Sequence, residues 1–233
     1  MRPHSRLASR AAVDDVAIEL HAEDVMVLDY AISAFVTIFL VVDPIAMAPT
    51  FLAITEDMPR HARKSVALRA SLIAGVILIG TALVGNRLLI LFGISPPAFR
   101  IAGGLLLFWI AAEMVFGVRS RHEGEAAEQA MEERVRNVAA FPLAIPLLAG
   151  PGAVAATVLL AGRAGVDWPL LGVLIAVEAL VALSCFVAFF LADRISGFLG
   201  VTGNIVLSRL LGILLAALAV QYVVDGIHAV IAG

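Results

Sequence analysis

One stretch, residues 31–54, contains a single charged residue, Asp43, in an otherwise largely apolar run. About 20 apolar residues are enough for a helix to cross the hydrocarbon core of a bilayer. The whole chain also departs from soluble proteins, because 61% of its residues are hydrophobic and 15% are charged. The sequence therefore predicts an all-α integral membrane protein, with this run as its first transmembrane helix.

Two prolines, Pro44 and Pro49, lie in the same run. A proline lacks the backbone N–H and its ring collides with the preceding turn, so a helix breaks or kinks there. The break is expected beside Asp43, near the middle of the membrane. Irregular backbone at that depth must be satisfied by protein or by a water-filled cavity, so the pattern predicts a cavity at the break.

The same pattern returns later in the chain, in residues 145–157. At one constant offset, Pro44 aligns with Pro146, Pro49 with Pro151 and Thr55 with Thr157. Two further stretches, which begin at Arg100 and Arg209, share the pattern Arg-x-x-Gly-x-Leu-Leu at a slightly different offset. One small insertion explains the difference, so the chain is interpreted as internally duplicated. The glycines Gly103, Gly104 and Gly212 in these stretches are expected at close helix contacts.

Alternating apolar and polar segments predict six transmembrane helices. Their expected ranges are 31–54, 70–87, 100–117, 138–162, 168–192 and 210–232. The chain then divides into a polar tail (1–25), a first three-helix repeat (26–117), a charged loop (118–137) and a second three-helix repeat (138–233). Because three is an odd number, the second repeat enters the membrane from the opposite face. We expect two inverted repeats, with the first helix of each broken by prolines.

The distribution of positive charge predicts the orientation. Most arginines and lysines outside the tail lie in the segments after the first, third and fifth spans. Since positively charged loops stay in the cytoplasm, residues 118–137 are expected inside and both termini outside. The tail leaves two alternatives open, because Met26 stands directly before the first span. Either residues 1–25 are a polar extension, or translation begins at or near Met26.

Asp43 and Glu178 are the carboxylates expected nearest the membrane centre, and both are candidates for proton coupling. Glu113 is interpreted as interfacial. The broken helices supply a solute path, since half-helix ends and free carbonyls can coordinate a substrate. The predicted path comprises Asp43, Pro44, Pro49, Thr50, Pro146, Gly150, Pro151, Gly152 and Thr157. In the alternative, the prolines only kink packed helices and the acids only contact neighbouring helices, as in a membrane scaffold or partner subunit.

Other kinds of chemistry find little support in the sequence. The single cysteine, Cys185, cannot form a disulfide or a redox pair within one chain and is expected to be a buried, inert thiol. The five histidines lie in tails, loops or near the end of the last span, so they form no predicted metal-ligand set. We expect no enzymatic activity, no cofactor and no nucleic-acid partner. The expected partners are the lipid bilayer, a small neutral solute, and a proton or another cation.

Four motifs occur in order along the chain. They are residues 43–55; Phe92-Gly93-Ile94-Ser95-Pro96 with Arg100-Ile101-Ala102-Gly103-Gly104; Pro142-Leu143-Ala144-Ile145-Pro146 with Ala149-Gly150-Pro151-Gly152; and Ser208-Arg209-Leu210-Leu211-Gly212. In this combination the chain, from about residue 26 to 231, resembles the MarC family of six-span bacterial inner-membrane proteins. Some members are classed as neutral amino acid transporters, so the resemblance implies transport of a small neutral solute. Ala46 replaces a glycine that is frequent in this family and is expected to narrow the cavity slightly.

Overall fold

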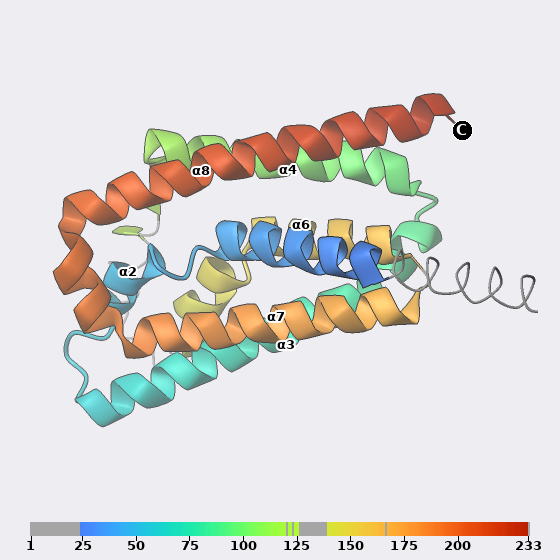
Figure 1. Ribbon diagram of the computed structural model, residues 1–233. Coiled ribbons are helices and arrows are strands. Elements are labelled where there is room, and N and C mark those ends of the chain that lie inside the picture. Colours follow the sequence, from blue (N-terminus) through green and yellow to red (C-terminus); the bar gives the residue numbers. More distant parts are fainter. Residues whose placement is uncertain (1–23, 120, 123, 126–138, 166, 233) are drawn as a thin grey trace, which may run out of the picture.

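The computed structural model describes residues 24–119, 121–122, 124–125, 139–165 and 167–232. Every regular element within these ranges is helical (Figure 1). Five of the helices are long and apolar enough to cross a membrane. The predicted all-α membrane class is therefore confirmed. The predicted tail, 1–25, lies almost wholly outside the described residues, as does most of the predicted loop 118–137.

Two of the predicted spans are divided into separate helices. The elements in chain order are an N-terminal helix Asp24–Val42, α2 Met47–Ile54, α3 Arg60–Leu91, α4 Pro96–Phe116, the π-helix η1 Ala139–Leu148, α6 Pro151–Ala164, α7 Trp168–Phe190 and α8 Ala192–Ala232. The predicted first span corresponds to the N-terminal helix and α2. The predicted fourth span corresponds to η1 and α6, and α6 alone is shorter than a typical transmembrane helix.

The long helices lie roughly along one direction (Figure 1). α4 packs against the long part of α8, and α3 packs against α7, each pair running antiparallel (Figure 1). The N-terminal helix and α6 lie between these pairs, and the Tyr30 hydroxyl joins them by donating to the Leu160 carbonyl oxygen (2.9 Å). The start of the N-terminal helix and the C-terminus lie at the same end of the bundle (Figure 1).

Glycines explain the close approach of α4 and α8. A Cβ built at Gly104 would lie 2.8 Å from the carbonyl oxygen of Ala219, and one at Gly212 would lie 2.8 Å from the Cβ of Met114. Helices in lipid associate largely through such contacts, because apolar surface gains little by leaving lipid for protein. The packing role predicted for Gly104 and Gly212 is confirmed.

Large apolar side chains cover much of the outer surface. Exposed examples on four of the long helices are Leu72, Val76, Trp109, Leu183 and Ile213. Soluble proteins rarely expose large apolar patches, whereas in a bilayer lipid acyl chains contact such patches. The interior is also apolar, so these helices are adapted to lipid on one side and to protein on the other.

Two helices, α3 and α8, begin well before the predicted starts of their spans. α3 starts at Arg60, directly after Pro59, because arginine and lysine are good helix formers and the basic segment continues the helix beyond the apolar span. α8 starts at Ala192 and bends at Gly200, whose φ of 60° suits glycine. Residues 192–199 therefore cross the end of the bundle before the long part of α8 begins (Figure 1).

Candidate functional site

The first break lies between the N-terminal helix, which ends at Val42, and α2, which begins at Met47. Asp43 has a φ of 50°, in the left-handed region. The residue before a proline is disfavoured in the helical conformation, and aspartate tolerates left-handed backbone better than most residues. Pro49 instead lies in the first turn of α2, where its missing N–H costs no intrahelical bond. The predicted break is present, and Pro44 rather than Pro49 stands at it.

The Asp43 carboxylate is buried, with 2% of the residue exposed. Its Oδ1 accepts a hydrogen bond from the Ala46 backbone N–H (3.3 Å), and its Oδ2 accepts one from the Ser208 hydroxyl on α8 (3.3 Å). One turn earlier on α8, the Asn204 amide donates to the Ala46 carbonyl oxygen (3.3 Å). The Arg119 guanidinium also attracts the Asp43 carboxylate electrostatically. Two polar side chains of α8 therefore hold the first break in place.

A cavity of about 330 Å³ adjoins the first break on the side of α8. Two predicted path residues, Pro49 and Thr50, line it together with Ala46. The opposite wall belongs to the bend of α8 and includes Gly200 and Asn204. In the described part of the chain, the buried Oδ1 of Asn204 has no hydrogen-bond partner, so this residue is left with an unused acceptor.

The second break separates η1, which ends at Leu148, from α6, which begins at Pro151. Proline suits the first helical position, because the N–H there has no intrahelical partner. A Cβ at Gly150 would lie 2.5 Å from the Pro146 carbonyl oxygen, and one at Gly152 would overlap Ile110 of α4. Close backbone approach therefore requires glycine at position 150, whereas Gly152 leaves room for the Ile110 side chain.

A second cavity, of about 300 Å³, lies beside this break. Four predicted path residues line it: Pro146, Gly150, Pro151 and Gly152. The lining also includes Glu113 of α4 and, beyond α4, Arg119 and His122. Because the first turn of α6 has no side-chain cap, its backbone N–H groups add partial positive charge. The cavity thus offers groups that suit a carboxylate and a group that suits an ammonium.

Glu178 and Thr157 form a separate buried contact. The Thr157 hydroxyl on α6 donates to Glu178 Oε1 on α7 (3.0 Å), and both residues are 0% exposed. Glu178 Oε2 has no hydrogen-bond partner within the described ranges. This pair lines neither cavity. Asp43 and Pro44, which stand at the first break itself, also line neither cavity. The structure therefore distributes the predicted path over the first break, two cavities and a buried pair.

Sequence reasoning missed the side chains of α8 that hold the first break, Asn204 and Ser208. They stand at positions i and i+4, which lie on one face of a helix. Two polar residues with this spacing, just ahead of a long apolar run, are a signal that could have identified them. Glu113, interpreted from the sequence as interfacial, lines the second cavity.

The long helices, their apolar exterior and the two interruptions define a multi-pass α-helical membrane protein. Residues 28–231 match the family described as MarC family integral membrane protein, and the chain belongs to this family. The family expected from the motifs is therefore confirmed.

Relatives in distant organisms are similar in sequence to this chain over most of their length. The chain is 38% identical over 203 residues to a UPF0056 membrane protein of Archaeoglobus fulgidus, which covers 86% of this chain and 93% of that protein. It is 36% identical over 202 residues to UPF0056 membrane protein YhcE of Escherichia coli, and the match covers 85% of this chain and 92% of that protein. It is 33% identical over 207 residues to UPF0056 membrane protein YvbG of Bacillus subtilis, and the match covers 87% of this chain and 96% of that protein. No solved structure matches the chain.

Proposed function

We propose that the protein transports a small neutral solute, such as a neutral amino acid, across the bacterial inner membrane. The second cavity is the observation that supports this most. A neutral amino acid carries a carboxylate, which suits Arg119 and the uncapped start of α6, and an ammonium, which suits Glu113. The volume of about 300 Å³ is at the lower end of ligand pockets and fits a small solute.

The helix pairing supports an inverted-repeat transporter. Counting η1 and α6 as one interrupted span gives six spans in two groups of three. Corresponding members are then neighbours: the N-terminal helix and α6, α3 and α7, α4 and α8 (Figure 1). Two inverted copies related by an axis in the membrane plane would pack in this way, and rocking of one against the other would give alternating access.

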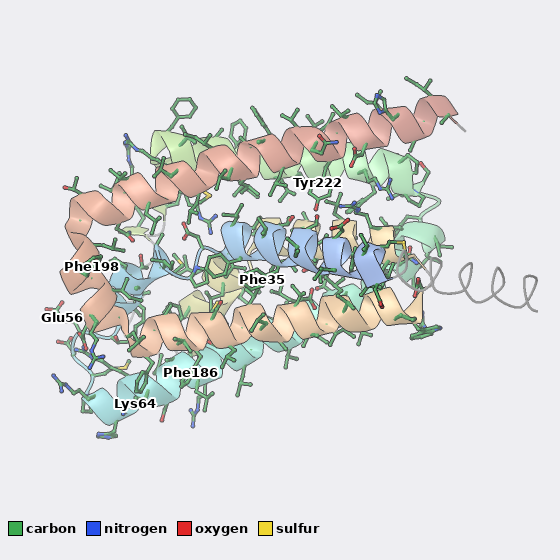
Figure 2. All side chains as sticks on the ribbon, in the orientation of Figure 1. Phe35, Glu56, Lys64, Phe186, Phe198 and Tyr222 are labelled. Atoms are coloured by element: carbon green, nitrogen blue, oxygen red, sulfur yellow. The ribbon has the colours of Figure 1, made fainter. Side chains whose placement is uncertain are left out.

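The proposed orientation places both termini outside the cytoplasm. Lys64, near the basic start of α3, lies at the end of the bundle opposite the C-terminus (Figures 1 and 2). Arg60 and Arg63 belong to the same helix start. The positive-inside rule assigns that end to the cytoplasm.

Proton coupling is proposed for Asp43 and Glu178, and the proposal includes no enzymatic step. Both acids are buried inside a bundle of apolar helices, where ionisable groups commonly belong to a proton or solute pathway. Glu178 has an oxygen without a hydrogen-bond partner in the described structure, and a proton there would remove an otherwise uncompensated charge. The two acids contact different helices, so each can respond to a different part of the transport cycle.

A second candidate function is a scaffold or partner subunit that transports nothing. The hydrogen bonds of Asp43 favour this alternative, because both carboxylate oxygens already have partners, in Ala46 and Ser208. An acid with only a packing role is expected to have hydrogen-bond partners for both of its carboxylate oxygens. The two breaks would then shape the contacts between helices and bind no solute.

Uptake and exchange by the purified protein in liposomes, screened across amino acids, test the proposal. At least one neutral amino acid should exchange. Glu113→Gln should reduce its uptake at low solute concentration about tenfold or more, because a hydrogen bond to a charged group contributes about 1.5–3 kcal/mol. Glu56→Gln, on the exposed turn before α3, is the matched control and should keep normal uptake. Absence of exchange for every amino acid, or normal uptake by Glu113→Gln, would favour the scaffold.

A further inference from the structure

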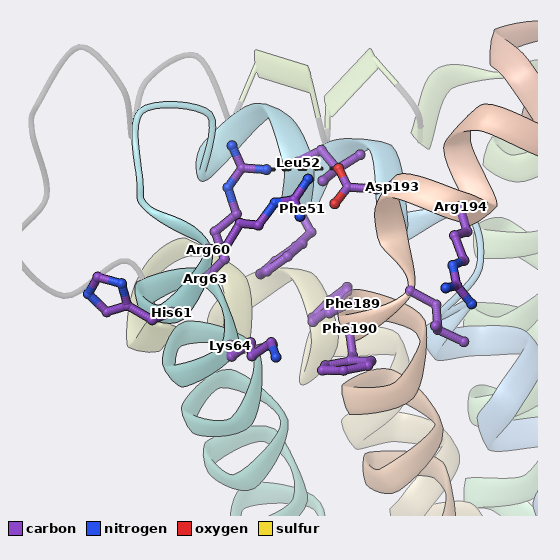
Figure 3. A pocket seen from close by; sticks show the side chains of 12 residues that line it. Phe51, Leu52, Arg60, His61, Arg63, Lys64, Phe189, Phe190, Asp193 and Arg194 are labelled. Atoms are coloured by element: carbon purple, nitrogen blue, oxygen red, sulfur yellow. Dashed lines mark ion pairs between the residues drawn. The ribbon is translucent and has the colours of Figure 1, made fainter.

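A third cavity, of about 600 Å³, lies away from the two cavities beside the helix breaks, where α2, α3, α7 and the start of α8 meet (Figure 3). We call it the basic cavity. Its lining contains four permanent cations, one histidine and one acid: Arg60, Arg63, Lys64, Arg194, His61 and Asp193. The excess of positive charge indicates an anionic ligand.

Two of the four cations already have partners within the protein. Arg63 donates to two backbone carbonyl oxygens of the preceding turn (3.1 and 2.8 Å), and its guanidinium lies 3.9 Å from the Asp193 carboxylate. The Lys64 ammonium lies 4.8 Å from the centre of the Phe190 ring. Both therefore shape the wall of the cavity.

The other two cations, Arg60 and Arg194, are exposed, and their side chains make no hydrogen bond or ion pair with any described residue. Arg60 opens α3, and the first turn of this helix contains no acid. A helix start carries partial positive charge, so cations there are unfavourable unless an anion is near. A phosphate bound in the cavity would offset this repulsion, since a planar guanidinium group can donate two hydrogen bonds to phosphate oxygens.

The floor of the basic cavity is aromatic. Phe51 of α2 and Phe189 of α7 stack with ring centroids 4.6 Å apart and planes inclined by 6°. Figure 3 shows these rings and Phe190 beside the basic side chains of α3 and α8. Phe51 and Phe189 are buried, but Phe190 is 50% exposed and offers an accessible apolar surface. A fully hydrated anion gains nothing from contact with Phe190, whereas an anion attached to hydrocarbon can pack against it. The ligand therefore has a phosphate head and an apolar portion.

The position along the helices fits the headgroup layer of a membrane. Arg60 is the first residue of a candidate membrane span, so the cavity lies at the end of the apolar region. Residues 192–199 cross the same end of the bundle, and Phe198 of this segment is 90% exposed (Figure 2). Short helices that present aromatic residues in this way lie at membrane interfaces. Basic pockets between transmembrane helices at this depth suit phospholipid headgroups.

We propose that the basic cavity binds the phosphate of an anionic phospholipid such as phosphatidylglycerol. Arg60 and Arg194 supply the unpaired positive charge that attracts the phosphate, and the half-exposed Phe190 contacts the adjoining apolar part of the lipid. The site shares no residue with the two cavities beside the helix breaks, so its test is independent of the proposed transport function.

Native mass spectrometry of the full chain in detergent measures binding of phosphatidylglycerol, phosphatidylcholine and glycerol phosphate. Phosphatidylglycerol should bind the most tightly of the three. The double variant Arg60→Gln, Arg194→Gln should weaken phosphatidylglycerol binding about tenfold for each arginine removed, with little change for phosphatidylcholine. The control variant Arg69→Gln, Arg87→Gln removes the same charge from α3 outside the cavity and should bind like the unmodified protein.

Three results would overturn the proposal. Phosphatidylglycerol and phosphatidylcholine both contain a phosphate but differ in net charge, so equal binding of the two would remove the preference for an anionic lipid. Unchanged binding by the Arg60, Arg194 variant would remove the site. Glycerol phosphate binding as tightly as phosphatidylglycerol would identify a site for a soluble phosphate in place of a lipid. Because Arg60 and Arg194 are exposed and unpaired, the variant should unfold at the same temperature as the unmodified protein when no lipid is added.

Discussion

The two helix breaks contain prolines at matching positions, yet the contacts that stabilise them differ. At the first break a buried carboxylate, Asp43, accepts hydrogen bonds from Ala46 and from Ser208 of α8. The second break contains no charge of its own; Gly150 allows its backbone to approach the Pro146 carbonyl oxygen, and Gly152 leaves room for the Ile110 side chain. The same interruption thus produces a hydrogen-bonded polar contact at the first break and a tightly packed turn of backbone at the second.

The two matching threonines differ in a similar way. Thr55 follows the last residue of α2 and donates to the Phe51 carbonyl oxygen of that helix (2.7 Å). Thr157 lies inside α6 and donates to Glu178 on α7 (3.0 Å). The helix after the first break has 8 residues and the helix after the second has 14, so only the second threonine still lies within a helix. Matching sequence positions therefore do not imply matching contacts.

The largest effect is expected from filling the second break. Gly152→Leu adds a side chain where even a Cβ overlaps Ile110, so solute uptake should be abolished and stability should fall by about 1–3 kcal/mol. Gly80→Leu is the matched control, because nothing lies within 4 Å of a Cβ at this helical glycine. Liposome uptake and thermal unfolding of both variants check the prediction. Equal uptake by the two would show that the second break is not a wall of the solute site.

An intermediate effect, confined to coupling, is expected at Glu178. Glu178→Gln keeps an oxygen for the Thr157 hydroxyl and nearly the same volume, but it cannot exchange a proton. Accumulation driven by a proton gradient should be lost, while solute exchange persists and stability changes by less than about 1 kcal/mol. Accumulation at the normal level would assign Glu178 a packing role only.

The smallest effect is expected from removing the hydrogen bond between Ser208 and Asp43 at the first break. Ser208→Ala removes one hydrogen bond to Asp43 and should lower stability by about 1 kcal/mol. Ser184→Ala is a suitable control, since the Ser184 hydroxyl donates to the Val181 carbonyl oxygen of its own helix (2.7 Å). Thermal unfolding compares the two variants. An equal or larger loss in Ser184→Ala would mean that Ser208 does not anchor the break.

Local rules made several features predictable from the sequence. The length of the apolar runs predicts membrane helices, Pro44 predicts the first break, and Gly104 and Gly212 predict close contacts between helices. Each of these depends on one residue or one short segment and on a strong physical constraint. Each is present in the structure.

The contacts between helices were harder to predict. α7 is apolar on all sides, so its sequence does not show that Glu178 turns toward Thr157 of α6. Ser208 meets Asp43 only because the bend at Gly200 directs the long part of α8 past the first break. Such contacts depend on how each helix is rotated and placed, and the apolar pattern leaves both undetermined. For the same reason, the single predicted path divides into the first break with Asp43 and Pro44, two cavities and a buried pair.

The central claim is that the first break supplies a proton-exchanging acid and the second binds the solute. Asp43→Asn tests it most directly, because asparagine keeps an oxygen for the Ala46 N–H and nearly the same size but loses the exchangeable proton. Asp57→Asn, on the exposed turn before α3, is the matched control. In liposomes with an imposed proton gradient, Asp43→Asn should exchange solute normally but fail to accumulate it, while Asp57→Asn does both. Normal accumulation by Asp43→Asn would contradict the account.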